Sequence, residues 1–172
     1  MRKFTTIAVL GAAAALLTAG PASASTHASA KATGNIVQVA SSAPQFSTLV
    51  SLIKKAGLVK TLSGKGPFTV MAPTNAAFAK VPKATLDQIA GDKTLLTKVL
   101  TYHVIAGKVP AAKVVTLNGK TATTVEGSTI AISVKGGKVY LNGSTQVTKT
   151  DIPASNGVIH QINGVLLPPD LD

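Results

Sequence analysis

The stretch GPFTVMAPTNAAF, residues 66–78, combines a short strand, a turn and the start of a helix. Its mostly apolar residues 68–72, bounded by Gly and Pro, favour an extended strand. Pro73 fixes its own φ angle and interrupts that strand. Thr74 is placed to cap the next helix, because its hydroxyl can accept a hydrogen bond from a free backbone N–H of the first turn. We therefore expect a strand over 68–72 and a short helix that ends at Phe78.

The chain on either side of this stretch has a helical pattern as far as residue 100. Phe46, Leu49, Val50 and Ile53 recur at the spacing of one helix face. Gly57 is typical of the left-handed residue that ends a helix. A short apolar helical face over 36–40 and two further helices over 84–90 and 94–100 complete this half.

After residue 100 the sequence favours antiparallel strands. Residues 101–105 alternate, and four turn dipeptides separate β-branched runs: Asn118-Gly119, Gly136-Gly137, Asn142-Gly143 and Asn163-Gly164. Further strands are expected over 114–117, 120–125, 129–135, 138–141, 145–150, 157–162 and 165–167. A helical first half packed on a meandering sheet is an α+β fold, with little room for parallel βαβ units.

Three segments together resemble the fasciclin-like domain family. Residues 66–78 are similar to its first signature, and Tyr102-His103-Val104 to its central segment. The stretch NGVIHQINGVL, residues 156–166, is similar to its second signature. The three occur in the family's order and spacing, and the likeness covers about residues 35–169. Secreted single-domain bacterial members are the nearest match in organisation.

This resemblance implies a β-wedge, an antiparallel β-sandwich packed with several N-terminal helices. It also implies a non-enzymatic extracellular module for adhesion or surface contact. In animal members two segments are linked to receptor binding, and the matching positions here are Asp151-Ile152 and Tyr102-His103. The chain departs from the family in having Pro153 where an aliphatic residue is usual and Asn163 where an acidic residue is common.

A second group of signature residues is expected to be structural. Strand alternation places Val158, His160 and Ile162 on one face, which predicts a neutral, hydrogen-bonded core histidine. We expect Tyr102, His103 and His160 to tie helix, sheet and signature turn together. The structural group as a whole comprises Pro73, Thr74, Asn75, Phe78, His160 and Asn163.

The N-terminus has the three parts of a secretion signal. Arg2 and Lys3 precede an apolar run over 7–19, and the small residues Ala22 and Ala24 form a cleavage pattern. We interpret residues 1–24 as a signal peptide, 25–34 as a flexible leader and 35–169 as one domain, which predicts a secreted, extracellular product. The alternative is an uncleaved N-terminal anchor. No later apolar run approaches the length of about 20 residues that spans a bilayer.

The charge of the chain is strongly positive and is carried by lysine. The net charge of +11 falls to +9 when Arg2 and Lys3 are removed with residues 1–24. The remaining chain has no arginine, the residue that pairs with phosphates and base edges, and this disfavours specific nucleic-acid recognition. The dispersed lysines fit either a solvated surface or loose attraction to an anionic cell-surface polymer. An unknown protein or such a polymer is therefore the expected partner of a monomeric domain.

Patterns typical of catalysis and metal binding are missing from the sequence. Asp151, Ser155 and His160 are the residue types of a serine hydrolase, but they lie far apart along one extended segment without a nucleophile elbow. The chain has no cysteine and only three histidines, none in a metal-binding motif. We therefore predict no catalytic residue, metal or cofactor.

Two hypotheses remain: a secreted interaction domain, or a soluble extracellular carrier of a small apolar ligand, which requires an enclosed cavity.

Overall fold

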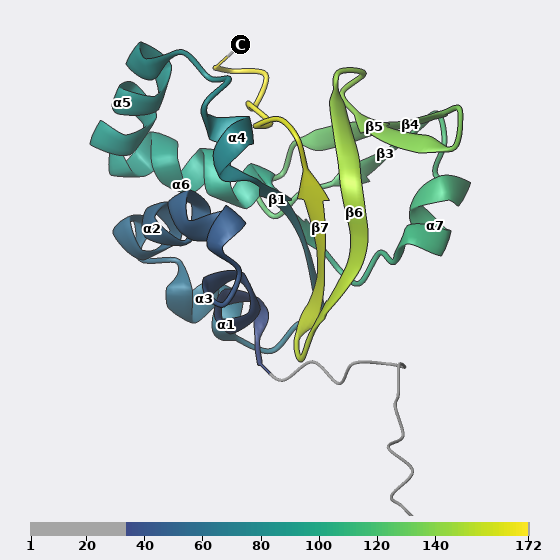
Figure 1. The fold of residues 1–172 in the computed structure, drawn as a ribbon, viewed down its shortest axis with the longest axis horizontal. Coiled ribbons are helices and arrows are strands. Elements are labelled where there is room, and N and C mark those ends of the chain that lie inside the picture. The colour runs from purple at the N-terminus through teal and green to yellow at the C-terminus, as the bar shows by residue number, and fades with distance from the viewer. Residues whose placement is uncertain (1–33, 172) are drawn as a thin grey trace, which may run out of the picture.

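A computed structural model describes residues 34–171 of the chain (Figure 1). The predicted signal peptide, residues 1–24, and residues 25–33 of the predicted leader lie outside the described residues. The predicted α+β class is confirmed, because most of the helices gather on one side of a seven-stranded sheet. The helices are α1 (Ile36–Ser41), the 3-10 helix η1 (Pro44–Phe46), α2 (Ser47–Ala56), α3 (Val59–Ser63), α4 (Asn75–Phe78), α5 (Lys83–Gly91), α6 (Lys93–Tyr102) and α7 (Ala111–Thr116).

Local signals in the sequence account for the longer helices. In α2 the predicted face is buried, and Gly57 ends the helix at φ 77°, with its N–H on the carbonyls of Ile53 and Lys54. Helix α6 is capped by Asp92, whose carboxylate accepts from the N–H groups of Thr94 and Leu95 at 2.7 and 3.2 Å. No helix within residues 34–171 has the length and apolar character needed to span a membrane.

The sheet has the strand order β2-β1-β7-β6-β5-β4-β3. Its strands are β1 (Phe68–Pro73), β2 (Val104–Ala106), β3 (Lys120–Thr123), β4 (Thr129–Lys135), β5 (Lys138–Leu141), β6 (Thr145–Ala154) and β7 (Gly157–Ile162). The two edges approach each other, since Ile105 of β2 bridges to Thr124 after β3 and the Val125 N–H donates to the Val104 carbonyl at 2.7 Å. This contact folds the sheet into a wedge and leaves neither edge strand fully open.

The expectation of a wholly antiparallel sheet was wrong in one place. Strand β1 pairs in parallel with β7, with Phe68 opposite Gly157 and Pro73 opposite Ile162. A parallel pair needs a long connection instead of a tight turn. Here nearly the whole domain provides that connection, so no turn dipeptide marks the pairing in the sequence.

Three predicted strand segments have other structures. Helix α6 continues to Tyr102, so the strand expected over 101–105 begins only at Val104. Residues 114–117 belong mainly to α7, whose first N–H, that of Ala111, is bonded by the Asp151 carboxylate at 2.8 Å. Residues 165–167 form no strand, because the Leu166 N–H donates to the His103 ring at 2.9 Å instead of to a neighbouring strand.

The paired strands β1 and β7 separate two hydrophobic cores. On one side Val70, Ala72 and Ile159 pack against the helices. On the other side Met71 and Ile162 pack against the inner face of the wedge formed by the remaining strands. Both faces of these strands are therefore buried, which explains their nearly continuous apolar sequences.

The closest approach of β1 and β7 generates a test of this packing. A Cβ added at Gly157 would lie 1.9 Å from the Phe68 carbonyl oxygen, whereas one added at Gly91 would meet nothing within 4 Å. We predict that Gly157→Ala lowers the free energy of unfolding by about 3 kcal/mol, because backbone must move. Gly91→Ala should leave it unchanged or raise it by up to about 1 kcal/mol. Urea denaturation of both variants measures this, and equal stabilities would contradict the described pairing.

Candidate functional site

The Tyr102-His103 pair lies inside the molecule. Both side chains are 2% exposed. The Tyr102 hydroxyl donates to the Thr129 carbonyl at 3.1 Å and accepts from Asn142 Nδ2 at 3.0 Å, which joins α6 to β4 and to the β5–β6 turn. In this structure the pair has no surface to offer a partner.

The His103 ring holds the end of the chain against α6. Its Nδ1 lies 2.8 Å from the Val99 carbonyl and its Nε2 accepts from the Leu166 N–H at 2.9 Å. These two bonds require a neutral ring with the proton on Nδ1. Burial lowers the pKa of His103 to about 4, although the bond to the Val99 carbonyl opposes the shift.

Asp151 and Ile152 differ in their surroundings. Asp151 is exposed and lies in an irregularity of β6 at φ +56°, a conformation that few non-glycine residues adopt. Its carboxylate bonds the first N–H of α7, that of Ala111. Ile152 pairs with Ile159 of β7 and packs partly buried against the helical core. The structure thus does not bring Asp151-Ile152 together with Tyr102-His103 at one surface.

His160 and Thr69 hold the loop of residues 107–110, which connects β2 with α7. The His160 Nε2 lies 2.7 Å from the Val109 carbonyl, and its Nδ1 accepts from the Asp151 N–H at 3.3 Å. The Thr69 hydroxyl donates to the Gly107 carbonyl at 2.7 Å and accepts from the Val109 N–H at 2.8 Å. Thr69 and His160 are at most 1% exposed, so these bonds satisfy polar groups that water cannot reach. Burial lowers the pKa of His160, opposed by the Val109 carbonyl and by Asp151.

The first signature turn connects β1 to the helices. The Thr74 hydroxyl accepts from the Ala77 N–H at 3.2 Å, which caps α4, while Pro73 and Phe78 are buried. Asn75 Nδ2 donates to the Pro44 carbonyl at 3.0 Å, and its Oδ1 accepts from the Thr48 N–H at 3.1 Å. The turn thereby fixes the start of α2.

Asn163, of the second signature, bonds its neighbours in the same manner. Its Oδ1 accepts from the Gln146 N–H at 3.0 Å, and its carbonyl accepts from Lys80 Nζ at 2.9 Å. These contacts join the end of β7 to β6 and to the residues after α4.

A surface cavity of about 490 Å³ lies beside the β6–β7 turn, and we call it the loop groove. Its walls come from three segments: residues 63–67, Lys108, and residues 154–157. Lys108, Ala154 and Gly157 also line an adjoining cavity of about 210 Å³, which extends toward Asp151. The loop groove was not predicted from the sequence, because its walls are far apart along the chain. Two walls include the first residues of the two signatures, Gly66-Pro67 and Asn156-Gly157, but neither pair forms a recognisable binding motif.

Asn156 fixes two walls of the loop groove to each other. Its Nδ2 donates to the carbonyls of Leu62 and Gly64 at 2.7 and 2.9 Å, and its Oδ1 accepts from the Ile36 N–H at 3.0 Å. In addition, the Phe68 N–H donates to the Asn156 carbonyl at 3.0 Å. The side chain therefore determines the shape of the groove and has no free polar atom for a ligand.

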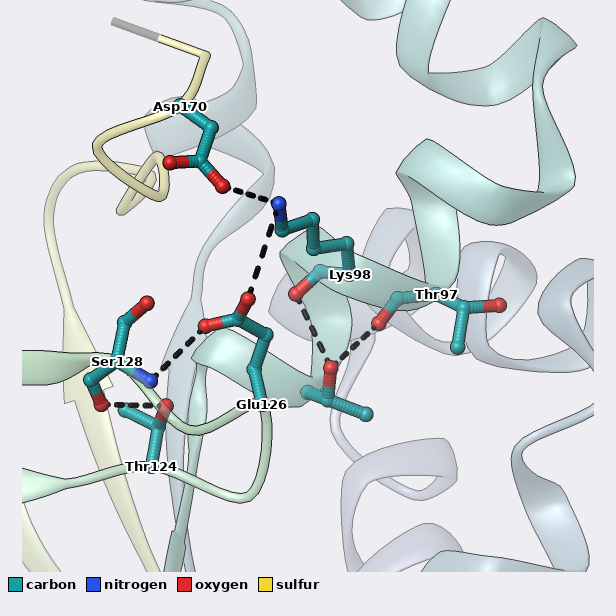
Figure 2. Close-up of polar contacts among 7 residues, drawn as sticks. Thr97, Lys98, Thr124, Glu126, Ser128 and Asp170 are labelled. Carbon is teal, nitrogen blue, oxygen red and sulfur yellow. Dashed lines mark hydrogen bonds and ion pairs between the residues drawn. The ribbon is translucent and has the colours of Figure 1, made fainter.

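Lys98 connects Glu126 with Asp170, which is close to the C-terminus, as Figure 2 shows. Its Nζ forms an ion pair with Asp170 and lies 3.9 Å from Glu126 Oε1. The other oxygen of Glu126 accepts from the Ser128 N–H at 3.1 Å. The bond to Asp170 is the main cause that raises the pKa of Lys98. The group attaches the last described residues to α6 and to the turn before β4.

Comparison with known proteins assigns the family. The Fasciclin domain matches residues 44–168, and the chain therefore belongs to the fasciclin family. It is 48% identical over 136 residues to protein sll1483 of Synechocystis, covering 78% of this chain and 73% of that protein. It is 34% identical over 139 residues to the immunogenic protein MPB70 of Mycobacterium bovis, covering 78% and 69% respectively.

A solved structure supports the fold. The FAS1 domain pair from the insect cell adhesion molecule fasciclin I superimposes with a TM-score of 0.66 over 81% of this chain and 53% of that one. The sequence identity of 18% limits this likeness to the fold.

The ring of His103 yields a prediction about acid stability. An unfolded histidine titrates at its ordinary pKa of 6.5, whereas the folded ring takes up its proton only at about pH 4. The contribution of His103 to the free energy of unfolding is therefore complete above pH 6.5 and decreases by about 3 kcal/mol as the pH falls to 4.

Two measurements check this contribution. Urea denaturation between pH 7 and pH 4 should show the loss, and a ¹⁵N NMR titration should show Nε2 unprotonated until about pH 4. A His103 ring that titrates near 6.5 in the folded protein would contradict the described bonds.

Proposed function

We propose that this fasciclin-domain chain is a secreted, non-enzymatic interaction domain that attaches to components of a cell surface or of the extracellular matrix. The family assignment supports a domain of this class, and the structural neighbour comes from a cell adhesion molecule. The partner is either a protein or an anionic surface polymer, and the distribution of charge favours the polymer.

The acidic side chains within residues 34–171 are largely engaged in internal contacts. Asp92 caps α6 and Asp151 bonds the start of α7. Glu126 and Asp170 both face Lys98 (Figure 2). Their charge is therefore used to hold the fold together and contributes little to an acidic surface that could bind a cationic partner.

Most lysines within residues 34–171, in contrast, form no ion pair, and this observation carries the proposal. In the part of the chain that the structure describes, Lys98 is the only lysine that forms an ion pair. The net positive charge of residues 34–171 is thus carried mainly by lysines that have no acidic partner among these residues. A surface of this kind attracts polyanions over distances comparable to the Debye length, about 10 Å at 0.1 M salt.

The geometry gives no support to hydrolytic activity. Both nitrogens of the His160 ring are bonded to backbone groups, and the Asp151 carboxylate bonds the Ala111 N–H. His160 therefore cannot act as a base toward Ser155 without giving up the contacts that hold the loop of residues 107–110. No three His, Asp or Glu side chains gather in a possible metal site within residues 34–171.

The alternative of a carrier for a small apolar ligand receives no support from the loop groove. A carrier site is an enclosed cavity with mainly hydrophobic walls. The loop groove is lined largely by glycine, serine, asparagine and lysine on surface loops. Its composition suits a polar ligand.

Attachment to cell envelopes tests the proposed function. We predict that the purified protein sediments with envelope fragments of the organism that produces it, and that raising the salt concentration from about 20 mM to about 500 mM releases most of it. The control is a neutral or acidic domain of similar size. Protein that stays in the supernatant at every salt concentration would contradict the proposal, and attachment that salt does not change would contradict its electrostatic basis.

A further inference from the structure

We propose that the loop groove binds an acidic polysaccharide, with the ammonium groups of Lys65 and Lys108 on its carboxylates. The inference rests on the proposed function and names its partner class and its site. The loop groove combines two cations with hydroxyl groups, and an acidic polysaccharide can be bound by both.

Lys108 lies at the junction of two cavities on a backbone that is held in place. This residue lines both the loop groove and the adjoining cavity, so it lies where the two meet. Its two chain neighbours are held from inside the molecule: Gly107 and Val109 bond the Thr69 hydroxyl, and Val109 also bonds the His160 ring. The Gly107 N–H further donates to the Pro67 carbonyl in the opposite wall, at 3.0 Å. The backbone of Lys108 is therefore fixed before any ligand arrives, which reduces the entropy lost on binding.

The opposite wall is fixed equally well. Lys65 lies between Gly64, whose carbonyl is bonded by Asn156, and Gly66. A Cβ added at Gly66 would lie 1.9 Å from the Asn156 carbonyl oxygen, so the two backbones are in direct contact. Lys65 and Lys108 thus extend from two walls that are connected by hydrogen bonds.

The residues that line the loop groove carry positive charge and no negative charge. None of the residues that line it is acidic, and residues 34–86 contain no Asp or Glu. The Asp151 carboxylate in the adjoining cavity already bonds the Ala111 N–H. An anionic ligand would therefore meet no fixed negative charge on the walls of the groove.

The uncharged part of the lining favours a sugar over a bare phosphate chain. Ser63 and Ser155 provide hydroxyl groups on two sides of the loop groove, beside peptide groups of the glycine positions. Hydroxyls and peptide groups both donate and accept hydrogen bonds, as the hydroxyls of a polysaccharide do.

Two pairs of lysine substitutions separate this site from diffuse attraction. The double variant Lys65→Gln, Lys108→Gln removes the cations of the loop groove. The control variant Lys135→Gln, Lys138→Gln removes the same charge at the β4–β5 turn, away from the β6–β7 turn in Figure 1. Thermal melts should show both variants folded, because all four lysines are exposed.

Binding is measured on immobilised alginate, a carboxylated polysaccharide, with polyphosphate and neutral dextran as comparison probes. We expect the unsubstituted protein to bind alginate at about 20 mM salt. The groove variant should bind alginate about tenfold more weakly, because it loses two direct contacts between exposed charges. The control variant should bind less than about threefold more weakly, because it loses only long-range attraction. Dextran should not be bound.

Three results would overturn the inference. Equal losses in the two variants would show that no particular lysines are recognised. Tighter binding of polyphosphate than of alginate, lost in the groove variant, would assign the groove to phosphate. If the protein ignores alginate but still sediments with cell envelopes, the groove inference is wrong while the proposed function stands; if it does neither, both are wrong.

Discussion

Strand β1 lies in parallel beside β7, a strand formed near the end of the domain, and this pairing connects the two signature segments. The contact leaves no space for a side chain, since Gly157 lies directly against the Phe68 backbone. Both strands are covered on two sides, by the helices and by the wedge of the remaining strands. The pairing therefore determines where the helical layer ends, where the wedge begins, and which loops meet at the β6–β7 turn.

The polar residues buried on these two strands connect the core with the surface. A buried hydroxyl or imidazole costs free energy unless it is hydrogen-bonded. Thr69 of β1 and His160 of β7 meet that requirement with backbone groups of residues 107–110. The result at the surface is a rigid loop that presents Lys108 at the loop groove. Thr69 and His160 have side chains of the types that occur in catalytic and binding sites. Here they hold the loop that positions Lys108, a residue that belongs to no sequence motif.

The sequence predicted the parts of the fold that depend on nearby residues. The face of α2 and its end at Gly57 follow from local spacing, and the β4–β5 and β5–β6 hairpins follow from their turn dipeptides. Helix α7 was mistaken for a strand because its valines favour strands, while the cap that stabilises its start comes from Asp151, far along the chain. The parallel pairing and the loop groove could not be predicted for the same reason. Both arise from segments that become neighbours only after folding.

Amide hydrogen exchange at Val109 tests most directly the claim that core polar groups fix this loop. Although Val109 lies outside the regular elements, its N–H donates to the buried Thr69 hydroxyl at 2.8 Å and should exchange as slowly as the amides of β7. Thr69→Val, which keeps the shape but removes the hydroxyl, should accelerate exchange at Val109 by at least about tenfold, the equivalent of one hydrogen bond, while β7 stays protected. Rapid exchange at Val109 in the unsubstituted protein, or no change in the variant, would contradict the account.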